Sequence, residues 1–320
     1  MEQTSRIGAV DAIKGFAIIS VLLIHSLPRQ ALLDSYAVFH IWQAVPLLIM
    51  MMGYTGVFTR VQPLGAYFHR RAVRLLIPWA VAWLAGLLFL ALRGDLASVI
   101  RPDVLLGALP LAEGAGNYFI TIVAEFILVL PLLRKLLDRG PWVFIATCFV
   151  LDLSFRLLAG HFGWDNYLFK ACLLRYLFAV GLGMLIAKGH KLWVLLPFSV
   201  VYLIAWTRGV TVPWIGGWQE QSLFAAGYTA ALVMLGLRFK YPAFLRMLGR
   251  MSWHIFLVQV LWFGGVGAAL LRRLPLTLST GPRVLLDVTV CLALGVLFAQ
   301  AETWVTRAWA KASARSGRSE

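Results

Sequence analysis

The first apolar stretch of the chain carries ionisable side chains that such stretches usually lack. Residues 6 to 26 are RIGAVDAIKGFAIISVLLIHS, which places Asp11, Lys14 and His25 on or before this run. Lys14 and His25 are eleven positions apart, which returns a helix to within about 20° of the same face. Ionisable groups inside a spanning helix are costly and usually face a bundle interior or a wet cavity. An imidazole titrates near neutral pH, so His25 is suited to proton transfer.

The spacing of Asp11 and Lys14 predicts an ion pair. The two residues are three positions apart, which brings their side chains within reach on a helix. We expect this pair to neutralise itself near one end of the segment, leaving His25 as the lone titratable group deeper in. For His25 alone, a core histidine bonded to a backbone carbonyl is the alternative interpretation.

A second cluster of functional groups lies in YFHRRAVRLLIPW, residues 67 to 79. Arg71 and Arg74 are three positions apart on one helix face, and Arg70 precedes Arg74 by four. Guanidinium groups bind phosphate through paired hydrogen bonds, so the cluster is a candidate anion site. On spacing alone, a basic anchor that keeps a loop in the cytoplasm is the favoured interpretation.

The elements that position these groups follow from composition. The 320-residue chain is 61% hydrophobic and 13% charged, with a mean hydropathy of +0.81. A water-soluble domain of this length could not keep that balance on its surface, so we predict an all-α, multi-pass membrane protein. About 20 apolar residues span a bilayer, which indicates about ten transmembrane helices in a single domain, residues 1–320. The predicted spans are 10–27, 38–58, 73–92, 118–133, 141–159, 168–187, 192–207, 219–237, 251–270 and 284–305.

The distribution of basic residues predicts the orientation. With both termini in the cytoplasm, most of the 29 Lys and Arg residues fall on the cytoplasmic side. The net charge of +15 therefore reflects topology and attraction to membrane lipids, and we expect no nucleic-acid partner. The three cysteines fall within apolar spans and are expected to be core residues, with no disulfide framework.

Several motifs together resemble the acyltransferase-3 family of integral-membrane O-acyltransferases. The first is a basic residue and a histidine on the first helix, here Lys14 and His25, after an Asp11 that fits the family's D-x-x-K/R-G opening. The second is a proline and a Gly-Tyr pair on the second helix, and the third is R-x-x-R followed by proline, here Arg71, Arg74 and Pro78. Later segments that resemble the family are LLRYLFAVGLGMLIAK at 173–188 and LGRMSWHIFLVQ at 248–259.

The resemblance implies a reaction and roles for residues. Members of the family move acyl groups, usually acetyl from acetyl-CoA, onto hydroxyls of cell-surface glycans and some smaller acceptors. By this resemblance His25 is the general base that takes the proton of the attacking hydroxyl. Arg71 and Arg74, with help from Arg70, would bind the phosphates of acyl-CoA. The implied location is the bacterial-type inner membrane, and no metal is expected.

A carboxylate near His25 would set its tautomer and stabilise the imidazolium. Asp11 is about 21 Å along the same helix from His25, which is too far for a direct hydrogen bond. Glu125, in the middle of the fourth predicted span, is therefore the better candidate, and a buried structural hydrogen-bonder is its alternative.

Two departures from the family pattern affect the interpretation. Many members end the late segment with a histidine, whereas this chain has Gln259 at that position. The histidine of this segment, His254, lies five positions earlier. Neither residue is therefore assigned a catalytic role. The fourth span also lacks the Trp and paired acids of glycan-modifying members, which leaves the acceptor open. The alternative function is a secondary transporter or lipid-handling scaffold whose buried charges bind ions or headgroups. No repeat symmetry of the kind transporters show is visible in the sequence.

Polar residues in later spans receive weaker interpretations. Asp152 and Arg156 are four positions apart and are expected to pair with each other. Lys170, Arg175 and Asp287 lie near span ends, where any of them could contact an acceptor.

Overall fold

The computed structural model describes residues 2–101, 104, 108–111, 116–164, 167–210, 223–273 and 278–316, with the side chains of 2–7, 168 and 308–316 left out. Within these ranges the chain forms helices and no strands, as the sequence predicts. The α-helices are α1 (Glu2–Ser26), α2 (Arg29–Asp34), α3 (Ala44–Phe58), α4 (Leu64–Leu92), α6 (Tyr118–Arg139), α7 (Pro141–His161), α8 (Tyr167–Ala171), α9 (Leu177–Ala187), α10 (Leu196–Thr207), α11 (Ala226–Gly236), α12 (Ala243–Arg250), α13 (Ser252–Leu261), α14 (Gly267–Leu271) and α15 (Thr280–Ser316).

Among the described residues, six segments are long and apolar enough to cross a membrane, which fits the predicted multi-pass class. They are Gly8–Ser26, Ala37–Phe58, Leu64–Leu92, Pro141–His161, Ser252–Leu271 and Thr280–Arg307. The other four predicted spans fall on α6 and on three shorter apolar helical segments, Leu173–Ala187, Trp193–Thr207 and Leu223–Gly236. Residues 219–222 of one predicted span lie outside the described residues.

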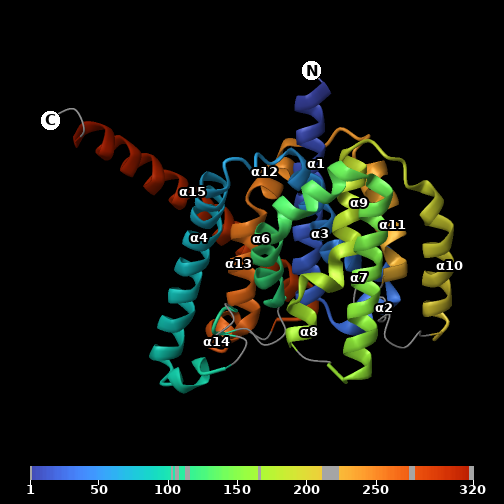
Figure 1. Cartoon of the computed structure of the whole chain (residues 1–320). Helices are drawn as coiled ribbons and strands as arrows, with labels where there is room; N and C mark the ends of the chain where they lie inside the picture. Colours follow the sequence, from blue (N-terminus) through green and yellow to red (C-terminus); the bar gives the residue numbers. More distant parts are fainter. Residues whose placement is uncertain are drawn as a thin grey trace.

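The long helices run up and down beside one another in a bundle (Figure 1). α1 begins and α15 ends at the same end of the bundle, which we call the terminal end; the other is the opposite end (Figure 1). The spanning window of α1 is 61% buried, whereas those of α4 and α15 are 22% and 17% buried. The helix that carries His25 is therefore central, and the helix that carries the arginine cluster lies at the edge of the bundle.

The close approach of two backbones fixes α1 in the bundle. A Cβ at Gly15 would overlap the carbonyl oxygen of Leu245 on α12, and a Cβ at Gly249 on α12 would overlap the carbonyl oxygen of Asp11. Only glycine allows helices to meet at this separation, as in other small-residue helix contacts in membranes. The glycines of the D-x-x-K-G and LGRMSW segments thus bring α1 and α12 together.

Several of the predicted spans are not continuous α-helices, and three of them show it most clearly. Within 38–58, the segments Ala37–Phe39 and Ile41–Gln43 are 3-10 turns, and α3 begins only at Ala44. Within 168–187, the chain is extended at Cys172 between α8 and the turn Leu173–Tyr176 that leads into α9. Within 251–270, a π-helical turn at Trp262–Val266 separates α13 from α14. A mean hydropathy averages over the whole segment, so it locates a span without locating the interruptions within it.

Candidate functional site

His25 lies in the wall of a cavity of about 320 Å³ near the opposite end of the bundle. It occupies the last turn of α1, and its ring centroid lies 5.6 Å from that of Phe263. Among the described residues the imidazole has no hydrogen-bond or ion-pair partner, so both ring nitrogens are available to a ligand. The volume is at the lower end of the range for small-molecule sites.

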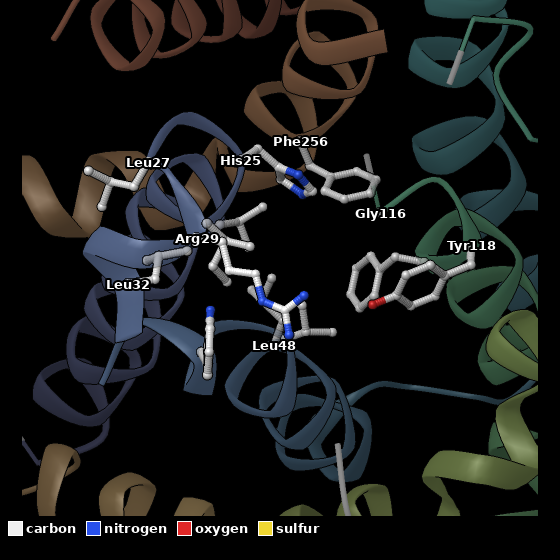
Figure 2. Close-up of a pocket in the computed structure, with 13 residues that line it drawn as sticks. His25, Leu27, Arg29, Leu32, Leu48, Gly116, Tyr118 and Phe256 are labelled. Carbon is white, nitrogen blue, oxygen red and sulfur yellow. The ribbon is translucent and has the colours of Figure 1, made fainter. Parts of the chain in front are cut away.

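The cavity is mostly apolar with a few polar groups (Figure 2). Arg29, Trp42 and Tyr118 add polar atoms beside His25. The apolar lining residues are Val21, Ile24, Leu27, Leu32, Val45, Leu48, Phe119 and Phe256. Apolar walls with a small number of placed polar groups are typical of ligand sites.

The segment before α6 closes one side of this cavity. Asn117 donates to the carbonyl of Leu109 at 3.0 Å and accepts from its N–H at 2.8 Å, which fixes the segment against the bundle. Gly116 has a φ of 78° and lines the cavity. A Cβ at Gly116 would lie 3.8 Å from Nε2 of His25 and 3.9 Å from Nε2 of Gln259. The imidazole and the Gln259 amide therefore approach the same short stretch of backbone.

The structure confirms the expected pair, which lies near the middle of α1. Nζ of Lys14 lies 3.1 Å from Oδ1 of Asp11. Asp11 is buried, and Lys14 is partly exposed. The charge of Lys14 is therefore compensated within its own helix, toward the terminal end and away from His25.

Glu125 has a defined contact elsewhere in the bundle. Its carboxylate accepts a 2.5 Å hydrogen bond from the backbone N–H of Leu173. That amide begins the helical turn after the extended residue Cys172, where no preceding carbonyl is placed to receive it. The carboxylate therefore joins α6 to the start of the α9 segment. The role of Glu125 beside His25 stays a prediction.

The arginine cluster lines a second cavity, of about 470 Å³, at the terminal end. Arg70, Arg71 and Arg74 line it from the first turns of α4, and Thr59 and Arg60 line it from the segment that follows α3. Tyr67 completes the lining, which contains no carboxylate. Nη2 of Arg71 donates to the hydroxyl of Thr59 at 2.6 Å. The sequence-predicted arginines thus meet in one cationic cavity.

Two contacts that hold this cavity have no sequence signal. Arg134 on α6 donates to the carbonyl of Thr59, and the hydroxyl of Tyr67 donates to the carbonyl of Ile127 at 2.8 Å. Both contacts join residues at least 60 positions apart, so no helical periodicity relates them. The distribution of basic residues predicts only a cytoplasmic position for Arg134, and no pattern in the sequence indicates Thr59 or Tyr67.

Other buried polar residues have partners that account for them. Nε of Arg156 lies 2.6 Å from Oδ1 of Asp152, as the spacing predicts. Trp262 and Arg283 donate to the two carboxylate oxygens of Asp287, at 2.8 and 2.9 Å. These contacts satisfy buried charges, as folding requires.

His254 and Arg175 also have defined surroundings. Nε2 of His254 lies 2.5 Å from the Glu302 carboxylate, which joins α13 to α15. The guanidinium of Arg175 lies 4.3 Å from the ring centroid of Phe169. Neither residue lines the His25 cavity. Across the described part of the chain, no group of three or more His, Cys, Asp or Glu side chains could hold a metal ion.

Comparison with known families identifies the class of the protein. A family model described as an acyltransferase domain, that of acyltransferase-3, matches residues 7–306. The chain therefore belongs to this family of membrane acyltransferases, and the match spans both cavities. The membership favours transfer chemistry over the transporter or scaffold alternative. Comparisons with curated proteins and with solved structures gave no significant match.

Proposed function

We propose that this chain transfers an acyl group, acetyl in the simplest case, from acyl-CoA to a hydroxyl of a cell-envelope glycan or a related acceptor. The observation that carries the proposal is the pair of cavities in a chain of this family. One holds an imidazole whose nitrogens are available, and the other holds four arginines at the other end of the bundle. The arginine cavity suits the phosphates of the donor.

In the proposed reaction His25 takes the proton of the acceptor hydroxyl as its oxygen attacks the thioester carbonyl. The new ester C–O bond forms, the C–S bond breaks, and the imidazolium returns the proton to the departing thiolate of CoA. General-base assistance of this kind contributes about 10²–10⁴-fold. We assign Glu125 as the candidate that stabilises the imidazolium. Asp11 and Lys14, which pair with each other on the helix that carries His25, complete the proposed catalytic set.

The proposed orientation places the terminal end in the cytoplasm of a bacterial-type cell, with the protein in the inner membrane. Basic residues gather at that end, which the positive-inside rule favours. Acyl-CoA, a cytoplasmic metabolite, would then enter at the arginine cavity. The acyl group would reach His25 through the bundle, and the acceptor would bind near the outer surface.

The direct test is acyl transfer by the purified protein in vesicles. Labelled acetyl-CoA is supplied on the arginine side and an envelope extract, as acceptor, on the other side, and the labelled ester and free CoA thiol are measured. We expect equal amounts of the two products, with both lost in His25→Gln. Thiol release without a labelled ester would indicate thioester hydrolysis, and no consumption of any acyl-CoA would contradict the proposal.

A further inference from the structure

A cationic side chain enters the His25 cavity from the loop that follows α1. α1 ends at Ser26, and Pro28 has an extended backbone conformation with φ of −58° and ψ of 144°. Arg29 is the first residue of the short helix α2 and lines the cavity. Figure 2 shows its side chain extending from the α1 side of the cavity toward Leu48 and Tyr118. The turn at Pro28 thus directs Arg29 into the cavity that holds His25.

The charge of Arg29 is not balanced by the groups around it. None of the thirteen residues that line the cavity is an Asp or Glu. The carboxylate nearest in sequence, Asp34, accepts a 2.7 Å hydrogen bond from Nε2 of Gln30. In the described part of the chain, the Arg29 guanidinium has no hydrogen-bond or ion-pair partner. Its five N–H groups are therefore available to a ligand.

The position of Arg29 in the bundle separates it from the donor site. It lies at the opposite end, whereas the arginine cavity lies at the terminal end (Figure 1). The positive-inside rule favours cations at the cytoplasmic, terminal end, whereas Arg29 lies at the opposite end. Anchoring of a cytoplasmic loop therefore does not explain the presence of Arg29. Arg29 and His25 line one cavity, so a molecule that fills it reaches both groups.

We infer that Arg29 binds an oxyanion carried by the acceptor, a carboxylate or a phosphate. This inference rests on the proposed function, because it names the substrate class of the same site. A guanidinium holds either group through two parallel hydrogen bonds, which fix orientation as well as position. The acceptor is then a hydroxylated anion, such as a sugar acid or a lipid with a hydroxyl-bearing phosphate headgroup. Its anion lies at Arg29 and its hydroxyl at His25.

The test compares matched probes that differ in the anion. Glucuronate is compared with glucose, and phosphatidylglycerol with diacylglycerol, on protein reconstituted in phosphatidylcholine nanodiscs. The variants are Arg29→Gln, Arg29→Lys and the control Arg208→Gln, which removes an exposed arginine at the same end of the bundle. The two readouts are the shift of the thermal unfolding midpoint with each probe and kcat/KM for acyl transfer from acetyl-CoA.

We expect an anionic probe, and not its neutral match, to raise the midpoint of the parent and of Arg208→Gln. Arg29→Gln should lose this shift and lower kcat/KM for the anionic acceptor about 10- to 100-fold, the range for one hydrogen bond to a charged group. Arg29→Lys should retain part of both effects, and donor affinity should stay unchanged. A shift with glucuronate alone identifies a sugar acid, and a shift with phosphatidylglycerol alone identifies a headgroup.

Two results separate this inference from the proposed function. Transfer that needs His25 but is equal in the parent and Arg29→Gln would overturn the inference and leave the function standing. An Arg29-dependent midpoint shift without transfer to any acceptor would support the anion site and contradict the function. Equal shifts with the anionic and neutral probes, or none with either anion, would overturn the inference.

Discussion

Nη2 of Arg71 donates a 2.6 Å hydrogen bond to the hydroxyl of Thr59. This contact joins the beginning of α4 to the residue that follows α3. Arg74, one helical turn further along α4, lines the same cavity without a hydrogen bond to any described residue. The protein therefore fixes the position of one guanidinium and leaves the other to a ligand.

We predict that replacing Arg74 by Ala weakens acyl-CoA binding without loss of stability, because its charge serves only the ligand. Arg71→Ala should weaken binding and also lower the unfolding midpoint, since the contact with Thr59 is lost. A hydrogen bond to a charged group contributes about 1.5–3 kcal/mol, so each change should cost about 10-fold or more in affinity. Lys at either position should restore charge without the paired geometry.

The measurement is the Kd of acetyl-CoA for each purified variant at several salt concentrations. Lys135→Ala is the matched control, because Lys135 is an exposed basic residue on α6 outside the cavity lining. Binding should weaken with added salt in the parent and less so in the double Ala variant. A double variant with parental affinity would show that the arginines only set topology.

The sequence predicted contacts within one helix and missed those between helices. Asp11 and Lys14, like Asp152 and Arg156, pair because helix geometry alone brings residues three or four positions apart together. Arg134 and Thr59 meet only because α6 packs beside the end of α3, which no local pattern encodes. The arginine cavity could therefore be predicted as a cluster, but the groups that hold it could not.

The same reasoning explains the cavity around His25. The sequence predicted a functional role for His25 on the first span, because an ionisable side chain is unusual within such a span. Arg29 and Gly116 come from loops whose path depends on tertiary contacts, such as the two hydrogen bonds between Asn117 and Leu109. One signal was present, since Arg29 is among the minority of basic residues that the predicted orientation leaves outside the cytoplasmic side.

Glu125 gives a prediction that separates a structural from a catalytic carboxylate. Glu125→Gln keeps an oxygen that accepts from the N–H of Leu173, so the unfolding midpoint should fall little. Glu125→Ala leaves that amide unsatisfied, which costs about 1–3 kcal/mol if the amide stays buried. If Glu125 also stabilises the His25 imidazolium, the Gln variant should be stable and slow in acyl transfer.

The two readouts are thermal stability and kcat for acyl transfer. A Gln variant with parental stability and a kcat lowered about 10-fold or more supports the predicted partnership with His25. Parental kcat in that variant would restrict Glu125 to its contact with Leu173. Leu128→Ala, which truncates an exposed side chain on the same helix, serves as a control for changes in α6 that leave the Glu125 contact in place.

The orientation gives a topological prediction. Arg71 and Arg318 should lie in the cytoplasm, and Arg101 and Arg273 on the other side, because this assignment places more basic residues inside. The structure places Arg71 at the terminal end and Arg101 beyond the far end of α4 (Figure 1), whereas Arg318 lies outside the described residues.

Single cysteines are labelled with a membrane-impermeant reagent in intact cells and in inverted vesicles. Cysteine at Gln62, an exposed loop residue, reports for Arg71 without disturbing the arginine cavity. Cysteines at Arg101 and Arg273 should react in intact cells, and those at Gln62 and Arg318 only in inverted vesicles. If the cysteines that replace Gln62 and Arg101 react from the same side, α4 does not cross the membrane between them. That result would also contradict the proposed donor site.

His25 carries the central prediction about the reaction. His25→Ala should leave a folded, membrane-inserted protein whose acyl transfer is lowered by at least about 10²-fold, the lower range for loss of a general base. His25→Gln is the sharper change, because its amide donates and accepts hydrogen bonds but does not take up a proton near neutral pH. Both variants should bind acyl-CoA normally, since the arginine cavity lies at the other end of the bundle.

Transfer of labelled acetyl to native membrane acceptors is measured beside protein yield, thermal stability and donor affinity. His161→Gln, an exposed histidine at the end of α7, is the matched control and should keep parental transfer. The imidazole has no hydrogen-bond partner among the described residues, so its loss should cost little stability. A structural histidine would behave in the opposite way, with Gln restoring function and Ala lowering yield. Near-parental transfer by His25→Gln would therefore exclude the general-base role.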